Sequence, residues 1–223
     1  PAHGVCGVVN CGWDTASSKA ALALAEKYPF FYAAVGIHPE NIGGGEVAEI
    51  EDLAHRKKCV AIGEIGLDYY WVDDNKEQQR ALFEEQLVLA NRLNLPVIVH
   101  DREAHAEMYE LLRQYRPRGV LHCYSGSAED AAWLTAQGMA LGFGGAVTYK
   151  GAKRAAKVLA MVPHELAVLE TDCPYMSPEP VRGTRNDSRN IAHVAAKIGE
   201  IWQMDAQSVL DLTAENAKRI FNQ

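Results

Sequence analysis

The chain has 223 residues, of which 48% are hydrophobic and 23% charged, a composition that excludes disordered and fibrous proteins and allows a large core. There are 22 Lys and Arg against 29 Asp and Glu, so the formal net charge is −7, and no general basic field draws the protein to nucleic acid or anionic lipid. The five cysteines form no C-x-x-C pair, and no apolar run approaches the roughly 18 residues of a membrane span, so we expect a cytoplasmic protein with no membrane association.

Short apolar runs recur along the chain and predict seven β-strands. They span residues 7–12, 31–39, 60–68, 96–100, 119–126, 140–148 and 166–174. The segments between them have helical periodicity, clearest in residues 15–27, with Asp14 or Thr15 as the cap, and in residues 77–93. Successive strands start 21 to 36 residues apart, which is the length of one βα unit.

Each βα unit returns the chain parallel to the preceding strand, and parallel strands that are buried on both faces are continuously apolar, as these are. The two best closures are an open doubly wound sheet and a (β/α) barrel. No linker rich in Pro, Gly or Ser interrupts the pattern. We therefore expect one α/β domain over residues 1–223.

Acidic and imidazole side chains interrupt the apolar runs at their carboxyl-terminal ends. They are Glu64, His100, His122, Glu170 and Asp172. In a barrel these ends form the rim that carries the active site, whereas the same groups at the opposite ends would indicate a stabilising role. Each could be an isolated buried polar residue, but together they suit divalent ions with mixed nitrogen and oxygen ligands.

Six ordered segments resemble the TatD family of metal-dependent deoxyribonucleases. They are GIHP at 36–39, GEIGLDY at 63–69, VIVHDREA at 97–104, LHCYSG at 121–126, LGFGGAVTYK at 141–150 and LETDCPY at 169–175. The resemblance covers essentially the whole chain. It implies a TIM-type (β/α)8 barrel, an α/β fold that carries a metal-dependent hydrolase site.

The resemblance also implies a ligand set for two divalent ions, Mg²⁺ or Mn²⁺, with Zn²⁺ as a further option. Glu64 would bridge the ions, His100 and His122 would bind one of them, and Asp172 would bind the other. The family's H-x-H pair on its first strand would complete the site, but no two histidines here are two residues apart. The strand at 7–12 corresponds to the family's second strand, so we expect about seven of eight βα units, with the N-terminal unit missing from this sequence.

Four side chains are candidates for binding the substrate. His38 follows an apolar run, and Arg102 follows the His100-Asp101 pair. Arg182 and Arg185 lie in the segment RGTRND and suit bidentate phosphate contacts, although surface solvation would also explain them. Glu170 shares a strand face with Asp172, and we expect it to support a ligand or shuttle a proton.

These features predict a divalent-metal-dependent hydrolase that cleaves phosphodiester bonds of DNA, or of RNA, with metal-activated water. Glu64 and Asp172 are the predicted catalytic residues, and the nucleic acid would be held locally through the metals. We expect a monomer. Two alternatives stay open: hydrolysis of another ester or of an amide on the same barrel, and a catalytically impaired ligand-binding barrel if the H-x-H pair is absent from the protein.

Overall fold

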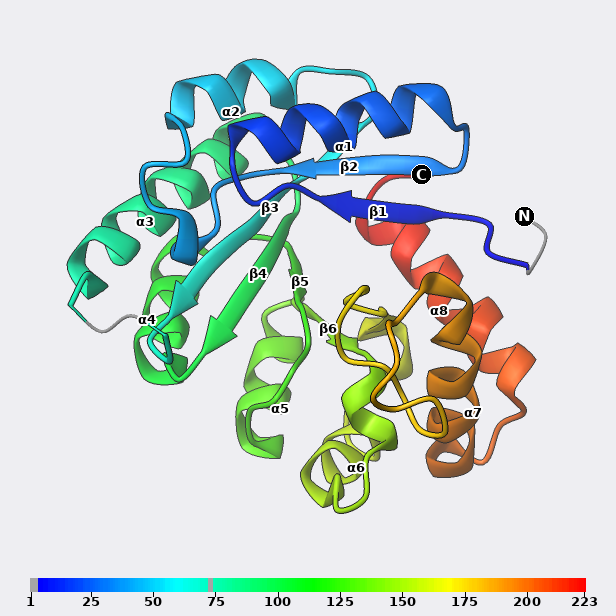
Figure 1. Cartoon of the computed structure of the whole chain (residues 1–223). Helices are drawn as coiled ribbons and strands as arrows, with labels where there is room; N and C mark the ends of the chain where they lie inside the picture. Colours follow the sequence, from blue (N-terminus) through cyan, green and yellow to red (C-terminus); the bar gives the residue numbers. More distant parts are fainter. Residues whose placement is uncertain (1–3, 72–73) are drawn as a thin grey trace. The chain divides into compact units, whose positions relative to one another are not determined.

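The computed structural model describes residues 4–71 and 74–223. It divides into two compact units, residues 6–120 and residues 121–221, and strands alternate with helices in each of them (Figure 1). The single domain over residues 1–223 stays a prediction. None of the helices in the described residues is long and apolar enough to cross a membrane.

The 6–120 unit is a parallel sheet with helices packed against it. Its strands are β1 (Val8–Cys11), β2 (Phe31–Val35), β3 (Cys59–Asp68) and β4 (Val97–Arg102), with the start of β5 (Gly119–Leu121). Its helices are α1 (Thr15–Lys27), the 3-10 helix η1 (Pro39–Asn41), α2 (Val47–Ala54), α3 (Lys76–Leu93) and α4 (His105–Tyr115). The strands β1 to β4 pair in chain order, and α1, α3 and α4 pack against β2, β3 and β4 (Figure 1).

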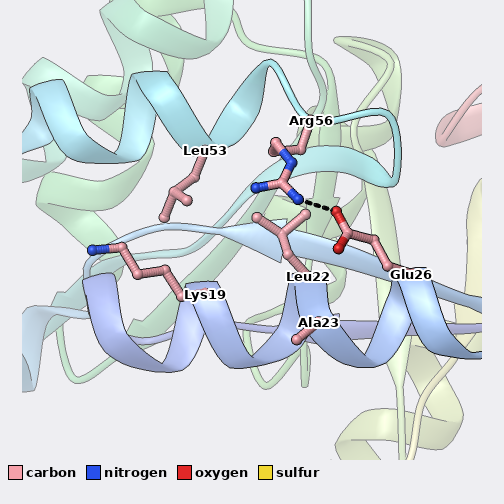
Figure 2. A pocket seen from close by; sticks show the side chains of 6 residues that line it. All are labelled: Lys19, Leu22, Ala23, Glu26, Leu53 and Arg56. Atoms are coloured by element: carbon pink, nitrogen blue, oxygen red, sulfur yellow. Dashed lines mark hydrogen bonds and ion pairs between the residues drawn. The ribbon is translucent and has the colours of Figure 1, made fainter.

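Helices α1 and α2 lie side by side (Figure 2). The first begins at Thr15 because the Asp14 carboxylate accepts the Ser17 backbone N–H at 2.6 Å, the N-cap that the sequence predicts. A shallow pocket lies between the two helices, and an ion pair joins Arg56 and Glu26 at its edge. Its lining is Lys19, Leu22, Ala23, Glu26, Leu53 and Arg56, a set without histidine that does not suit a metal.

A bulge interrupts the pairing of β3 with β4. Ile62 pairs with Val97 and Ile65 pairs with Val99, so β3 has one residue more than β4 over this stretch. The inserted backbone contains Glu64, whose N–H donates to the Gly12 carbonyl at 2.8 Å. A bulge re-aims the side chain that it carries. Glu64 is accordingly the partly exposed residue of a strand that is otherwise buried.

The 121–221 unit contains the remaining elements. They are α5 (Ala128–Ala136), β6 (Ala140–Phe143), η2 (Gly145–Thr148), α6 (Lys153–Leu159), η3 (His164–Leu166), β7 (Ala167–Leu169), η4 (Ser188–Asn190), α7 (Ile191–Trp202) and α8 (Ala206–Ile220). Strands β6 and β7 are parallel, α7 packs on α8, and α8 covers β7. The Asn216 side chain ties α8 to this layer by donating to the Ala167 carbonyl at 2.9 Å.

Across residues 4–71 and 74–223 the structure has the seven strands that the sequence predicts, although four of them end four or five residues earlier than expected, those predicted at 31–39, 119–126, 140–148 and 166–174. The strand predicted at 31–39 ends at Val35, because Pro39 begins a 3-10 helix and has no N–H for a strand ladder. The strand predicted at 166–174 ends at Leu169. His38, Glu170 and Asp172 therefore lie in loops beyond the strands, whereas Glu64 and His100 lie within them.

Candidate metal centre

His38, Glu64 and His100 come together at the carboxyl-terminal side of β2, β3 and β4. One ligand atom of each lies within 4.8 Å of the others. The Glu64 Oε1 atom is 3.3 Å from His38 Nε2 and 3.1 Å from His100 Nδ1. The two imidazole rings meet edge to face, with centroids 4.5 Å apart. The three side chains are 13–20% exposed, so a ligand can reach them from solvent.

Two buried glutamines of α3 hydrogen-bond to the backbone of the segments that carry this cluster or support it. Gln86 bonds both the N–H and the carbonyl of Ile37, at 2.8 and 3.0 Å, beside His38. Gln79 bonds both backbone groups of Asp68 in the same way, each at 2.8 Å. Sequence reasoning missed both residues. The sequence signal for both was a pair of amide side chains, seven residues apart, on the buried face of an amphipathic helix, where apolar side chains are usual.

Gly66 lets the backbones of β3 and β4 approach each other next to the cluster. Its φ is +148°, and a Cβ added there would lie 2.0 Å from the His100 carbonyl oxygen. A larger residue would push β4 away, and His100 would move with it. The glycine of the GLDY segment is thus required by the close approach.

Asp68 orients the His100 ring, a role that the sequence analysis did not assign. Its Oδ2 atom is 2.9 Å from His100 Nε2, and its Oδ1 atom accepts the backbone N–H groups of Tyr70 and Trp71 at 2.9 and 3.3 Å. Burial raises the pKa of Asp68, but the hydrogen bonds from His100 and Tyr70 outweigh it and hold that pKa below its ordinary value. The ionised carboxylate therefore accepts the Nε2 proton of His100.

With its proton on Nε2, the His100 ring turns the lone pair of Nδ1 toward Glu64. Nδ1 and the Glu64 Oε1 atom are only 3.1 Å apart, and two electron-rich atoms at that distance repel each other unless a cation or a second proton lies between them. A carboxylate that fixes the tautomer of a ligating histidine is the usual support of a metal site. The donor set of Glu64 and His100 therefore fits a divalent cation.

His38 differs from His100 in the nitrogen that is already occupied. Its Nδ1 accepts the Glu40 backbone N–H at 3.2 Å, so the neutral ring carries its proton on Nε2. That nitrogen faces Glu64 and acts as a donor there. The geometry thus makes His38 a hydrogen-bond donor to a carboxylate or a phosphate oxygen, although the distances alone would also admit it as a metal ligand.

The other two predicted ligands, His122 and Asp172, belong to the 121–221 unit. His122 directly follows β5, and its Nδ1 is 3.6 Å from the Glu170 Oε2 atom. Glu170 also accepts the Cys123 backbone N–H at 2.5 Å. Asp172 is exposed in the loop after β7 and has a positive φ of 51°. Glu170 thus lies beside His122, and its role in supporting a ligand or shuttling a proton stays a prediction.

Gly142 makes room for Glu170. A Cβ added at Gly142 would lie 2.8 Å from the Glu170 Oε2 atom and 3.1 Å from the His122 Cα atom. The glycine-rich segment around β6 therefore leaves space for a carboxylate that a larger residue would displace.

The predicted substrate-binding arginines are found in two different settings. Arg102 lies over the Tyr70 ring, with its guanidinium carbon 3.9 Å from the ring centroid. Arg182 lies over the Tyr149 ring at 4.1 Å, and its Nη1 is 3.8 Å from Glu179. Arg185 is exposed. Stacking leaves the guanidinium edges of Arg102 and Arg182 able to donate to a phosphate.

The alternating α/β fold and the histidine–carboxylate cluster at the strand ends are those of a metal-dependent hydrolase. The family model described as TatD related DNase matches residues 1–222. The chain belongs to this family.

Individual relatives agree with that assignment. The chain is 38% identical to the uncharacterized metal-dependent hydrolase YabD of Bacillus subtilis, over 96% of this chain and 86% of that protein. It is 33% identical to the 3'-5' ssDNA/RNA exonuclease TatD of Edwardsiella piscicida, over 98% and 88%. The crystal structure of YjjV, a TatD homologue from Escherichia coli, superposes with a TM-score of 0.92 at 33% identity, over 99% of this chain and 88% of that one. The predicted family and the TIM-barrel class, with about seven of eight βα units, are confirmed.

Proposed function

We propose that this metal-dependent hydrolase is a nuclease that cleaves phosphodiester bonds of single-stranded DNA, and of RNA. The observation that carries the proposal is the pair of Glu64 and His100, whose facing atoms are 3.1 Å apart and suit a cation between them. A relative that is 33% identical over almost the whole chain is named as an exonuclease that acts on these polymers in the 3'-5' direction. A cytoplasmic location and a monomeric state are part of the same proposal.

Glu64 and His100 would hold the cation in the 6–120 unit, and we keep His122 and Asp172 as the ligands that the family resemblance implies. We propose two ions, Mg²⁺ or Mn²⁺, since carboxylate oxygens suit them, while imidazole nitrogen also admits Zn²⁺. Bound ions would polarise the phosphodiester and supply a nucleophile at neutral pH.

The side chains of the chain itself have distinct tasks in this proposal. Asp68 keeps the His100 proton on Nε2, so that Nδ1 stays available as a donor of electrons. His38 donates from Nε2 to Glu64 or to a phosphate oxygen. Asp172, which is exposed to solvent, would orient the attacking water and accept its proton. Glu170 would steady His122.

The arginines would contact the phosphates that flank the reacting one. Arg102 serves this purpose in the 6–120 unit, and Arg182 and Arg185 in the 121–221 unit. With a net charge of −7, such local contacts must replace a continuous basic track.

The decisive variant is Glu64→Gln, which keeps the size of the side chain and removes its charge. We expect metal-stimulated hydrolysis of a labelled single strand to fall by at least about 100-fold, because removing an ion-binding carboxylate costs several kcal/mol of transition-state stabilisation. Glu85→Gln, the same change at an exposed residue of α3, is the matched control and should keep full activity. Full turnover by Glu64→Gln would refute the assigned role.

The choice of substrate needs its own measurement. The purified protein is assayed with Mg²⁺, Mn²⁺ and Zn²⁺ on a labelled single strand and on a panel of small esters and amides. Hydrolysis of the strand supports a nuclease. Hydrolysis of the small esters or amides alone would show that this hydrolase acts on another bond.

A further inference from the structure

Two exposed aromatic side chains and one arginine gather where β3 and β4 end, the two strands that carry Glu64 and His100. The Tyr70 and Trp71 rings meet at right angles with centroids 4.7 Å apart. The Arg102 guanidinium carbon lies 3.9 Å from the Tyr70 centroid and 5.2 Å from that of Trp71. We call Tyr70, Trp71 and Arg102 the aromatic platform.

The platform is ordered and yet open to solvent. Tyr70 is 54% exposed and Trp71 is 63% exposed, so much of each ring surface is bare. Packing does not explain these rings, since a fold that needed them for its core would bury them. The Arg102 guanidinium and the perpendicular packing of the two rings hold them in one arrangement, which lowers the entropy that they would lose when a ligand binds.

The platform and the metal centre share one carboxylate. Asp68 accepts the backbone N–H groups of Tyr70 and Trp71 through Oδ1, and it accepts the His100 proton through Oδ2. Gln79 clamps the Asp68 backbone in turn. The same buried group therefore fixes the backbone that carries the rings and orients the proposed metal ligand.

We propose that the aromatic platform stacks an unpaired nucleobase of the nucleic-acid substrate, beside the phosphate at Glu64 and His100; the inference rests on the proposed nuclease function. Every base has a π-face, so stacking on Trp and Tyr tolerates any sequence. An acidic protein with a net charge of −7 gains from this mode of binding, because stacking needs no long basic track. Bases inside a duplex have both faces covered, and the platform therefore selects single strands and frayed ends.

The first experiment compares Trp71→Ala with the intact protein on a single-stranded oligonucleotide. We expect KM to rise about 5- to 150-fold, equivalent to about 1–3 kcal/mol for one stacked base, while kcat stays within about twofold. Trp71→Phe keeps a flat ring and should recover most of the affinity. An oligonucleotide with abasic residues at its 3' end should bind equally weakly to all three proteins.

Tyr28→Ala is the matched control. Tyr28 is an exposed aromatic residue with a lysine cation over its ring at 5.3 Å, but it lies at the end of α1, before the first residue of β2. Like the platform, Tyr28 combines an exposed aromatic ring with a cation, but it lies at the amino-terminal ends of the strands. Its replacement by alanine should therefore leave KM unchanged. An unchanged KM in Trp71→Ala, or an equal loss on the abasic oligonucleotide, would overturn the proposal.

A binding measurement separates this inference from the proposed function. Adding oligo(dT) without metal should quench part of the tryptophan fluorescence, and that part should be missing in Trp71→Phe. Quenching by oligo(dT) together with no hydrolysis after Mg²⁺ or Mn²⁺ is added would refute the nuclease and leave the platform intact. Hydrolysis with identical quenching in both proteins would refute the platform and leave the nuclease intact.

Discussion

Replacing Asp68 with asparagine tests the positioning of His100. The Asp68 carboxylate accepts three N–H groups, from His100, Tyr70 and Trp71, and its side chain is fully buried. An asparagine amide can keep its oxygen toward the two backbone N–H groups, but its NH₂ then faces the His100 Nε2–H. Two donors 2.9 Å apart repel, so the imidazole proton moves to Nδ1. Nδ1 then has no lone pair for the cation beside Glu64.

The size of the effect follows from what the carboxylate does. Removing the hydrogen-bond partner of a ligating histidine typically costs about 10- to 100-fold in metal affinity. That range corresponds to about 1.4–2.8 kcal/mol of binding free energy. Rotating the asparagine amide by 180° would leave the backbone N–H groups of Tyr70 and Trp71 without their acceptor. A buried unsatisfied group costs about 1–3 kcal/mol of stability, so this rotamer does not restore the native arrangement.

The assay is a titration of Mn²⁺ into the metal-free protein, followed by activity against metal concentration. We expect a larger dissociation constant for Mn²⁺ in Asp68→Asn, and partial rescue of the hydrolysis rate at high metal concentration. Asp52→Asn, the same change at an exposed residue of α2, should bind Mn²⁺ like the unmodified chain. An affinity for Mn²⁺ within twofold of the unmodified chain in Asp68→Asn would refute the argument from the tautomer.

Two further predictions concern titratable groups outside the site. Burial raises the pKa of Glu107, but the hydrogen bonds from Tyr69 and Arg80, at 2.7 and 2.8 Å, outweigh it and hold that pKa below its ordinary value. A carboxyl whose pKa is lowered by folding stabilises the protein at a pH above its unfolded-state pKa, and this stability is lost as the pH falls through its folded-state pKa. Glu107→Gln should therefore lower the free energy of unfolding in urea by about 1 kcal/mol at pH 7 and by almost nothing near pH 3. An equal loss at pH 7 and pH 3 would contradict this. Burial raises the pKa of the Cys59 thiol to about 11, so Ellman's reagent at pH 8 should modify the exposed Cys6 and Cys173 and spare Cys59 until the chain unfolds, as peptide mass mapping would show.

The order of the elements and the ends of the strands that carry the chemistry could be predicted from the sequence. Apolar runs and helical periodicity are local signals, and α3 spans Lys76–Leu93 against a predicted 77–93. Glu64 and His100 could be singled out because an acid and an imidazole interrupt otherwise apolar runs. Gln79 and Gln86 were missed, since an amide on an apolar helix face does not say which backbone it will bond.

Contacts between distant parts of the chain were decided by tertiary structure alone. The bulge that re-aims Glu64 depends on the register of β3 against β4, and a register is a relation between two segments that neither encodes by itself. Asp68 and His100 are 32 residues apart, and Arg102 stacks on Tyr70 from the next strand. The amino-acid order by itself determined which elements form and in which order. Packing determined which side chains are in contact, because residues far apart in the sequence meet only after the strands have paired and the helices have packed on them.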